Sequence, residues 1–216
     1  MSPLFLHVQK NTATLRKKFL HVAVKTPHLF GIVPAYSYLR TMNRLTNPII
    51  WLCRFRQRCG YGVHSPFAFR FITDVIYETT PYYAYLELGR NLPFRDRFRI
   101  RRILQLLFRI SNWRQPKNIV CLTSSAIIIR YLREGCKMAY ITDRIPKEQI
   151  DLLWLDKPDN AVLPHLHEHS VLILDRLNKN KEWFTSLPAV VSFDLYDIGI
   201  AFFDTKYNKQ HYIVNF

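Results

Sequence analysis

The sequence predicts an α/β fold whose sheet is mostly parallel, and two observations support this. After Pro116, four apolar runs of strand length alternate with helical stretches: Ile119 to Leu122, Met138 to Thr142, Leu152 to Leu155 and Val171 to Leu174. Continuous apolar runs of this kind are typical of parallel strands that are buried on both faces. The first run leads into a turn and a helix, KNIVCLTSSAIIIR at 117–130, as the first strand of a nucleotide-binding domain does.

Two helices are predicted before the first strand. Ser65 is a suitable N-cap with Pro66 at the first helical position, and apolar residues continue that helix to Ile76. The second helix has an apolar stripe, with arginines mostly on its other faces. The stripe consists of Ile100, Ile103, Leu104, Leu107 and Ile110, and the arginines of the basic exterior are Arg99, Arg101, Arg102 and Arg109.

The C-terminal stretch predicts antiparallel pairing. Val190 to Asp194, Gly199 to Phe203 and His211 to Phe216 lie close together in the chain, and Thr205 to Lys209 forms a polar turn. Short strands that are joined in this way predict an antiparallel hairpin at the edge of the sheet.

Composition predicts one globular domain, residues 60–216, after a basic extension, residues 1–59. The chain has 216 residues, of which 49% are hydrophobic, enough for one core. Its four cysteines have no CxxC spacing, which indicates structural thiols in a reducing compartment. No apolar stretch reaches the ~18 residues that span a bilayer, and no secretion signal is visible, so we expect a cytoplasmic protein.

Positive charge is concentrated at the front of the chain. The whole chain has a net charge of +15. Residues 1–73 contain eleven Lys or Arg and no Asp or Glu, whereas the other residues carry twenty bases against sixteen acids. Arginines that alternate with aromatic residues, as in Arg54-Phe55-Arg56, can bind nucleic acid or an anionic membrane surface. A solvated basic arm without a partner is the alternative.

The turn after the first predicted strand contains no glycine, since it reads Leu122-Thr123-Ser124-Ser125-Ala126-Ile127. A backbone that must approach a cofactor closely normally uses glycine there, because a Cβ obstructs the approach and disfavours positive φ. The turn therefore predicts poor access for a cofactor.

Two segments near the ends of the predicted domain are similar to one family. They are GYGVHSPFAFRFITDVIYE at 60–78, followed by the pair Tyr82-Tyr83, and VVSFDLYDIGIAFFDTKYNKQHYIVNF at 190–216. Both resemble the class I S-adenosylmethionine (SAM)-dependent methyltransferase-like proteins common in Bacteroidota, and the resemblance extends over residues 60–216. It implies a bacterial protein with a Rossmann-like class I methyltransferase sheet and SAM as the cofactor.

This resemblance implies a cofactor site in a vestigial or weak form. Where the family has acid-x-Gly-Thr-Ser-x-Gly, Cys121 replaces the acid, and Thr123 and Ile127 replace the two glycines. A carboxylate such as Asp143, 21 residues beyond Leu122, is spaced to bind a ribose, although it is equally well read as a polar strand end. The implied cofactor-binding residues are Thr123, Ser124, Ser125, Asp143 and Asp156.

One βα unit is expected to be missing from the sheet. The segment that starts at Ile150 resembles the family's fourth strand, yet only seven positions separate it from Asp143. A crossover between parallel strands needs at least ~10 residues, so a helix, a strand and a second helix do not fit there. In the family the missing unit forms a wall of the adenine pocket, and its loss also weakens SAM binding.

Two groups of side chains resemble metal ligands, but we expect no metal site. Carboxylates after the fourth and fifth strands bind a divalent cation in related O-methyltransferases; here Arg176 would place a positive charge beside the ion. The histidines in PHLHEHS would share one face of a strand, but the resemblance places them before the fifth strand, where polar residues are common. The first group consists of Asp156, Asp175 and Asn178. The second group consists of His165, His167 and His169.

Three functions stay open at this point, and no catalytic residue is predicted. The first is a methyltransferase-like pseudoenzyme that binds an unknown small molecule or protein. The second is an active SAM-dependent methyltransferase of unknown substrate, with Asp143, Asp156 and Asp175 at the carboxyl ends of the strands. The third is a nucleic-acid-binding protein that uses residues 1–73 as an electrostatic arm.

Overall fold

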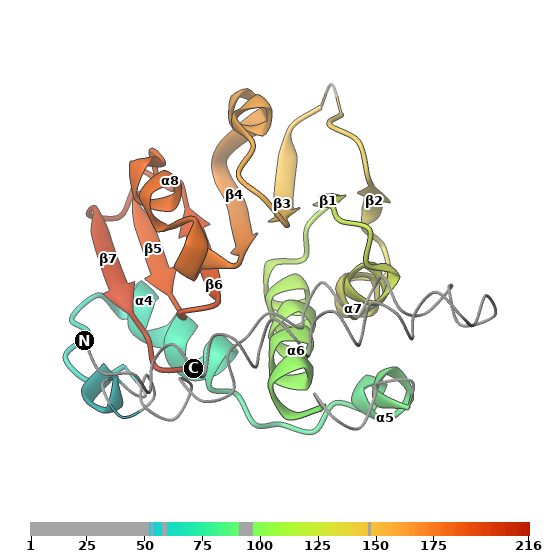
Figure 1. The fold of residues 1–216 in the computed structure, drawn as a ribbon, viewed down its shortest axis with the longest axis horizontal. Helices are drawn as coiled ribbons and strands as arrows, with labels where there is room; N and C mark the ends of the chain where they lie inside the picture. The colour runs from blue at the N-terminus through green and yellow to red at the C-terminus, as the bar shows by residue number, and fades with distance from the viewer. Residues whose placement is uncertain (1–51, 53, 58–59, 91–96, 147) are drawn as a thin grey trace, which may run out of the picture. The chain divides into compact units, whose positions relative to one another are not determined.

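The computed structural model describes residues 52, 54–57, 60–90, 97–146 and 148–216. The chain divides into two units, Met1–Thr41 and Met42–Phe216, and every described residue belongs to the second (Figure 1). Most of the predicted extension, with Cys53 and Cys59, therefore lies outside the described residues. The predicted domain boundary between residues 59 and 60 stays a prediction.

The first long described segment folds as its capping signal predicts. After a short 3-10 turn, η3 (Phe55–Gln57), the helix α4 (Pro66–Phe71) begins with proline at its first position. The Ser65 Oγ accepts a hydrogen bond from the backbone N–H of Ala68, at 3.4 Å, which confirms the predicted N-cap. A π-helical turn, η4 (Ile72–Ile76), continues α4, and α5 (Ala84–Gly89) follows.

The helix α6 (Arg97–Arg114) buries the predicted apolar stripe, whose five residues are at most 4% exposed. Arg109 corrects the prediction of a basic exterior, because its side chain is buried. Its guanidinium donates hydrogen bonds to the carbonyl oxygens of Val75, at 2.6 Å, and Ile76, at 3.1 Å. Buried carbonyl groups need such donors, so Arg109 joins α6 to η4.

A seven-stranded sheet follows, with strand order β2-β1-β3-β4-β6-β5-β7. Every strand is parallel to its neighbours except β6, which pairs antiparallel with both β4 and β5. The α/β fold with a mostly parallel sheet is thus confirmed, and so are its four predicted strands. The elements are β1 (Asn118–Leu122), α7 (Ala126–Gly135), β2 (Tyr140–Thr142), β3 (Ile150–Leu155), η6 (Asn160–His165), β4 (Leu166–Asp175), η7 (Leu177–Lys179), α8 (Lys181–Ser186), β5 (Val191–Asp194), β6 (Ile198–Phe202) and β7 (Gln210–Ile213).

The predicted antiparallel hairpin is present as β5 and β6, but its turn is residues 195–197. The prediction that Thr205 to Lys209 turns the chain back as a hairpin was wrong. Residues 203–209 instead carry the chain past β5 to β7, which pairs with β5 in parallel, with Val191 opposite Gln210. Both edges of β6 are already paired with β4 and β5, so the third segment had to join the far side of β5.

The connection between β2 and β3 is as short as the sequence indicated. Residues 143–149 contain neither a helix nor a strand among those that are described. Both strands flank β1, and β2 is only three residues long, so the chain returns over a short distance. The loss of a βα unit relative to the methyltransferase family stays a prediction.

Apolar side chains cover both faces of the sheet, which explains the continuous apolar runs. On one face, Leu153 and Leu172 belong to a core cluster that includes Phe184 of α8. On the other, Phe71 of α4 packs on Phe193 and Phe202, with ring centroids 4.9 Å apart in both cases. In Figure 1 the helices α4 to α7, coloured cyan to olive, lie together and apart from the orange α8.

Candidate functional site

Three neighbouring strands end at the same level of the sheet, and the residues that come directly after them form a row. Leu122 of β1 lies opposite Leu155 of β3, which lies opposite Leu174 of β4. The next residues are therefore neighbours across the sheet, on backbones about 4.8 Å apart. They are Thr123, Asp156 and Asp175, which we call the strand-end row. Ligands of open α/β sheets bind at the carboxyl ends of the strands, so this row is the candidate site.

Asp156 is held in the row by a side chain that sequence reasoning missed. The Nε1 of Trp154 donates a hydrogen bond to Oδ1 of Asp156 at 2.7 Å, and Asp156 is only 7% exposed. Residues i and i+2 of a strand point to the same face, so the Trp-x-Asp spacing is the signal that could have revealed this contact. The indole engages one of the two carboxylate oxygens.

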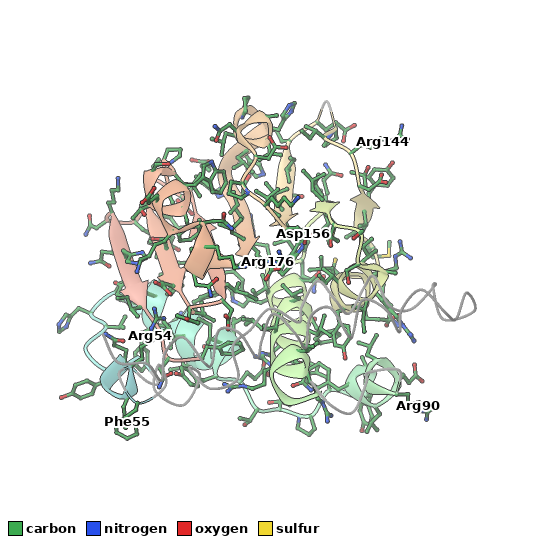
Figure 2. The ribbon with its side chains drawn as sticks, viewed as in Figure 1. Arg54, Phe55, Arg90, Arg144, Asp156 and Arg176 are labelled. Atoms are coloured by element: carbon green, nitrogen blue, oxygen red, sulfur yellow. The ribbon has the colours of Figure 1, made fainter. Side chains whose placement is uncertain are left out.

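Asp175 is buried beside Asp156, and burial raises the pKa of its carboxyl to about 6. Arg176 opposes this effect, with its Nε at 3.6 Å from Oδ2 of Asp175, whereas the charge of Asp156 reinforces it. Figure 2 shows the labelled Asp156 and Arg176 at the ends of β3 and β4. Arg176 has a φ of 52°, a left-handed conformation that is uncommon for a residue other than glycine and that clusters at functional sites.

A hydrogen bond between a backbone N–H and a side chain closes the turn after β1. Ser125 is the N-cap of α7, and its backbone N–H donates to the Thr123 Oγ1 at 3.1 Å. The Ser125 side chain is 1% exposed, and its Oγ has no hydrogen-bond partner among the described residues. Of the three hydroxyl-bearing residues of the turn, only Ser124 is exposed, whereas Thr123 is half-buried and Ser125 is buried.

Glycine is not required by the backbone of this turn. Among the described residues, positive φ occurs at Gln115, Arg176, Tyr196, Gly60 and Gly62, all outside 122–127. The turn therefore accommodates side chains without left-handed strain, and each Cβ occupies space that a glycine would leave to a ligand.

Cys121, the residue before the turn, is fully buried as a free thiol. Burial, and then the nearby charge of Asp156, raise the pKa of this thiol above its usual range. The side chain is consequently neutral. The position where the resemblance implies an acid carries no charge to attract a cation.

Asp143 lies apart from the strand-end row. It follows β2, whose Thr142 pairs with Val120, so Asp143 lies at the level of Cys121. Its side chain is exposed. Of the five residues that the resemblance implied, Thr123, Ser124 and Ser125 form one turn next to Asp156, while Asp143 belongs to the neighbouring strand end.

Within the described part of the chain, His, Cys, Asp and Glu side chains form no group of three that could hold a metal ion. The prediction that the three histidines lie before the strand was wrong for two of them, since His165 ends η6 whereas His167 and His169 lie on β4. The Nε2 of His167 lies 3.0 Å from Oδ1 of Asp151, a carboxylate whose pKa is lowered by hydrogen bonds from two backbone N–H groups and from this histidine, against the effect of its burial.

Comparison with known proteins returns no match to a family model, a curated protein or a solved structure. The described helices also include none that is long and apolar enough to cross a membrane. The strand-end row and the fold around it thus provide the basis for a functional proposal.

Proposed function

We propose that this chain is a methyltransferase-like binding protein whose cofactor turn no longer binds SAM. The observation that carries the proposal is the turn after β1. A buried, neutral thiol at Cys121 replaces the acid that would attract the cationic part of SAM. Thr123 closes the turn through its own side chain, where a glycine would leave the backbone open.

The surroundings of the turn support the same proposal. Asp156, the nearest carboxylate of the row, is buried and engaged by the Trp154 indole. The described residues of the short connection 143–149 include no helix that could wall an adenine pocket beside β2. Compared with the family's SAM site, this turn therefore has less negative charge to attract the cofactor, a less accessible backbone and less enclosure of an adenine ring.

A calorimetric titration of the full chain with SAM tests the proposal. We expect no binding tighter than ~100 μM, which corresponds to about −5.5 kcal/mol. A parallel titration with S-adenosylhomocysteine, which lacks the sulfonium charge, separates loss of charge from loss of access. Tight binding of either compound would overturn the proposal, because a cofactor pocket would then exist.

One observation favours an active methyltransferase as the second candidate. Asp156 and Asp175 lie on neighbouring strand ends, and the Asp175 carboxyl has a pKa of about 6, which suits proton transfer near neutral pH. This function requires SAM, so the same titration decides between the two candidates. If SAM binds tightly, Asp175→Asn should reduce methyl transfer while leaving SAM affinity unchanged.

A further inference from the structure

A cavity of about 640 Å³ lies between residues 76–86 and the helix α6. None of the three residues of the strand-end row lines it. Its volume is in the range of about 300–1,000 Å³ that is typical of small-molecule sites. The cavity is therefore large enough for a small molecule.

Aromatic rings form one wall of the cavity. Tyr82 and Tyr85 line it, with their ring centroids 5.3 Å apart, and both pack against Phe108 of α6, at 5.0 and 5.2 Å. Tyr83 also lines the cavity and is 93% exposed. Tyr85 is only 7% exposed, so the stacking surface for a planar ligand comes from the half-buried ring of Tyr82, which Phe108 supports, and from the exposed ring of Tyr83.

Three arginines and one glutamate supply the charged side chains of the lining, which are Arg101, Arg102, Arg109 and Glu78. Glu78 accepts a hydrogen bond from the Tyr82 hydroxyl at 2.8 Å. The Arg109 guanidinium already donates its hydrogen bonds to backbone carbonyl groups. The Arg102 guanidinium lies 4.6 Å from the centroid of the Phe216 ring.

Arg101 differs from these three residues. Its side chain is exposed on the first half of α6, and within the described part of the chain it makes no hydrogen bond or ion pair. An arginine with no carboxylate partner at the edge of an aromatic cavity can form charge-assisted hydrogen bonds with an anionic ligand.

Neutral polar side chains also line the cavity. Thr79 and Thr80 contribute hydroxyl groups, and Gln105 of α6 contributes an amide. Hydroxyl and amide groups can both donate hydrogen bonds to the hydroxyl groups of a ligand and accept hydrogen bonds from them. Tyrosine rings and arginine guanidinium groups do not recognise ligand hydroxyl groups selectively. The cavity therefore combines three chemistries: aromatic faces, neutral hydrogen-bonding groups and a cation.

We propose that this cavity binds a mononucleotide, with its base against the tyrosines, its sugar hydroxyls near Thr79, Thr80 and Gln105, and its phosphate at Arg101. The inference goes beyond the proposed function, since it assigns a class of ligand to a cavity outside the strand-end row. It concerns a separate site, because no residue of the turn after β1 lines the cavity.

Calorimetric titration of the full chain with AMP, adenosine and inorganic phosphate tests the proposal. AMP carries all three chemical features, adenosine lacks the anion, and phosphate lacks the ring and the sugar. We expect AMP to bind at least about tenfold more tightly than either of the others, since a hydrogen bond to a charged group contributes about that factor. Equal binding of adenosine, equal binding of phosphate, or no AMP binding at millimolar concentration would overturn the proposal.

Two pairs of variants locate the site. Arg101→Gln should weaken AMP binding about tenfold, whereas Arg144→Gln, an exposed arginine that Figure 2 shows far from α6, should leave it unchanged. Tyr83→Ala should weaken it about fivefold or more, whereas Tyr140→Ala, which removes an exposed tyrosine of β2, should not. Equal effects within either pair would show surface association instead of a site.

The outcomes remain distinguishable from those of the SAM titration. SAM that binds and is insensitive to Arg101→Gln would occupy another site; the proposed function would then fail while the nucleotide site stood. Weak SAM binding together with arginine-independent AMP binding would overturn only the nucleotide site.

Discussion

At the end of β4, burial separates the Asp175 carboxyl from water and raises its pKa from 3.8 to about 6. At pH values between 3.8 and about 6, the Asp175 carboxyl is mostly protonated in the folded protein and mostly ionised in the unfolded chain. Stability due to this residue is therefore fully present below pH 4 and is lost as the pH rises through 6, by roughly 3 kcal/mol in all.

Asp175→Asn tests this linkage, because asparagine does not titrate. We expect the free energy of unfolding of the wild type, minus that of the variant, to fall by about 2 kcal/mol from pH 4 to pH 7. Urea unfolding at a series of pH values measures it. The difference between the two proteins is the quantity to follow, since Asp194 and Asp151 have lowered pKa values and give the opposite trend in both. A difference that is constant with pH would contradict the prediction.

Individual residues of the candidate site were predictable to different degrees. The turn of Thr123 to Ser125 and the acid Asp156 follow apolar runs, and such positions lie at strand ends whatever the strand order. The indole of Trp154 on Asp156 and the burial of Arg109 were not predicted, because each depends on where a long side chain finds a partner.

At the scale of elements, α6 and α7 pack closely at one glycine. A Cβ on Gly135 would lie 2.5 Å from the carbonyl oxygen of Phe108 and 2.8 Å from the Cβ of Ser111. The Ser111 hydroxyl donates to the carbonyl oxygen of Leu132 at 2.8 Å, next to this contact. The two helices can keep their spacing only if position 135 has no side chain.

Gly135→Ala should therefore lower the free energy of unfolding by about 2 kcal/mol, since the added methyl group meets backbone atoms that cannot move aside alone. Gly89→Ala is the matched control, because a Cβ on this residue of α5 has no atom within 4 Å. We expect that change to be neutral or to stabilise by up to about 1 kcal/mol. Thermal or urea unfolding compares the two variants, and similar values for both would refute the close approach.

At the scale of the whole molecule, Arg54 connects the segment before residue 60 to the sheet. Its guanidinium lies 2.9 Å from Oδ1 of Asp194, a carboxylate that is 2% exposed at the end of β5. Despite its burial, Asp194 has a lowered pKa because of hydrogen bonds from Arg54 and the backbone of Tyr196. Asn215 also donates its backbone N–H to the carbonyl oxygen of Gln57 at 3.0 Å.

A chain that begins at Gly60 should consequently be less stable than one that begins at Met42, by about 2 kcal/mol or more. Of the two cationic partners of the buried Asp194 among the described residues, it keeps only Lys181, at 3.2 Å. Urea unfolding of both chains measures the effect, and Arg54→Gln in the longer chain should reproduce a large part of it. Equal stability of the two chains would show that residues 42–59 do not support the sheet.

The basic front of the chain has a separate test. Residues 1–59 contain ten of the eleven bases in residues 1–73. If these residues form an electrostatic arm, the chain that begins at Gly60 should elute from heparin at clearly lower salt than the full chain, since polyanion binding weakens as bases are removed. Elution of both chains at the same salt concentration would remove the case for nucleic-acid binding through this region.

The sequence by itself determined the α/β class, the four parallel strands, the Ser65 cap and the lack of glycine after β1. Each depends on neighbours in the chain: double burial requires an apolar run, and a cap bonds within its own turn. Only the tertiary structure decided the parallel placement of β7, the burial of Arg109 and the cavity with Arg101. These depend on which distant segments share a surface, and local patterns of polarity are the same for several such arrangements.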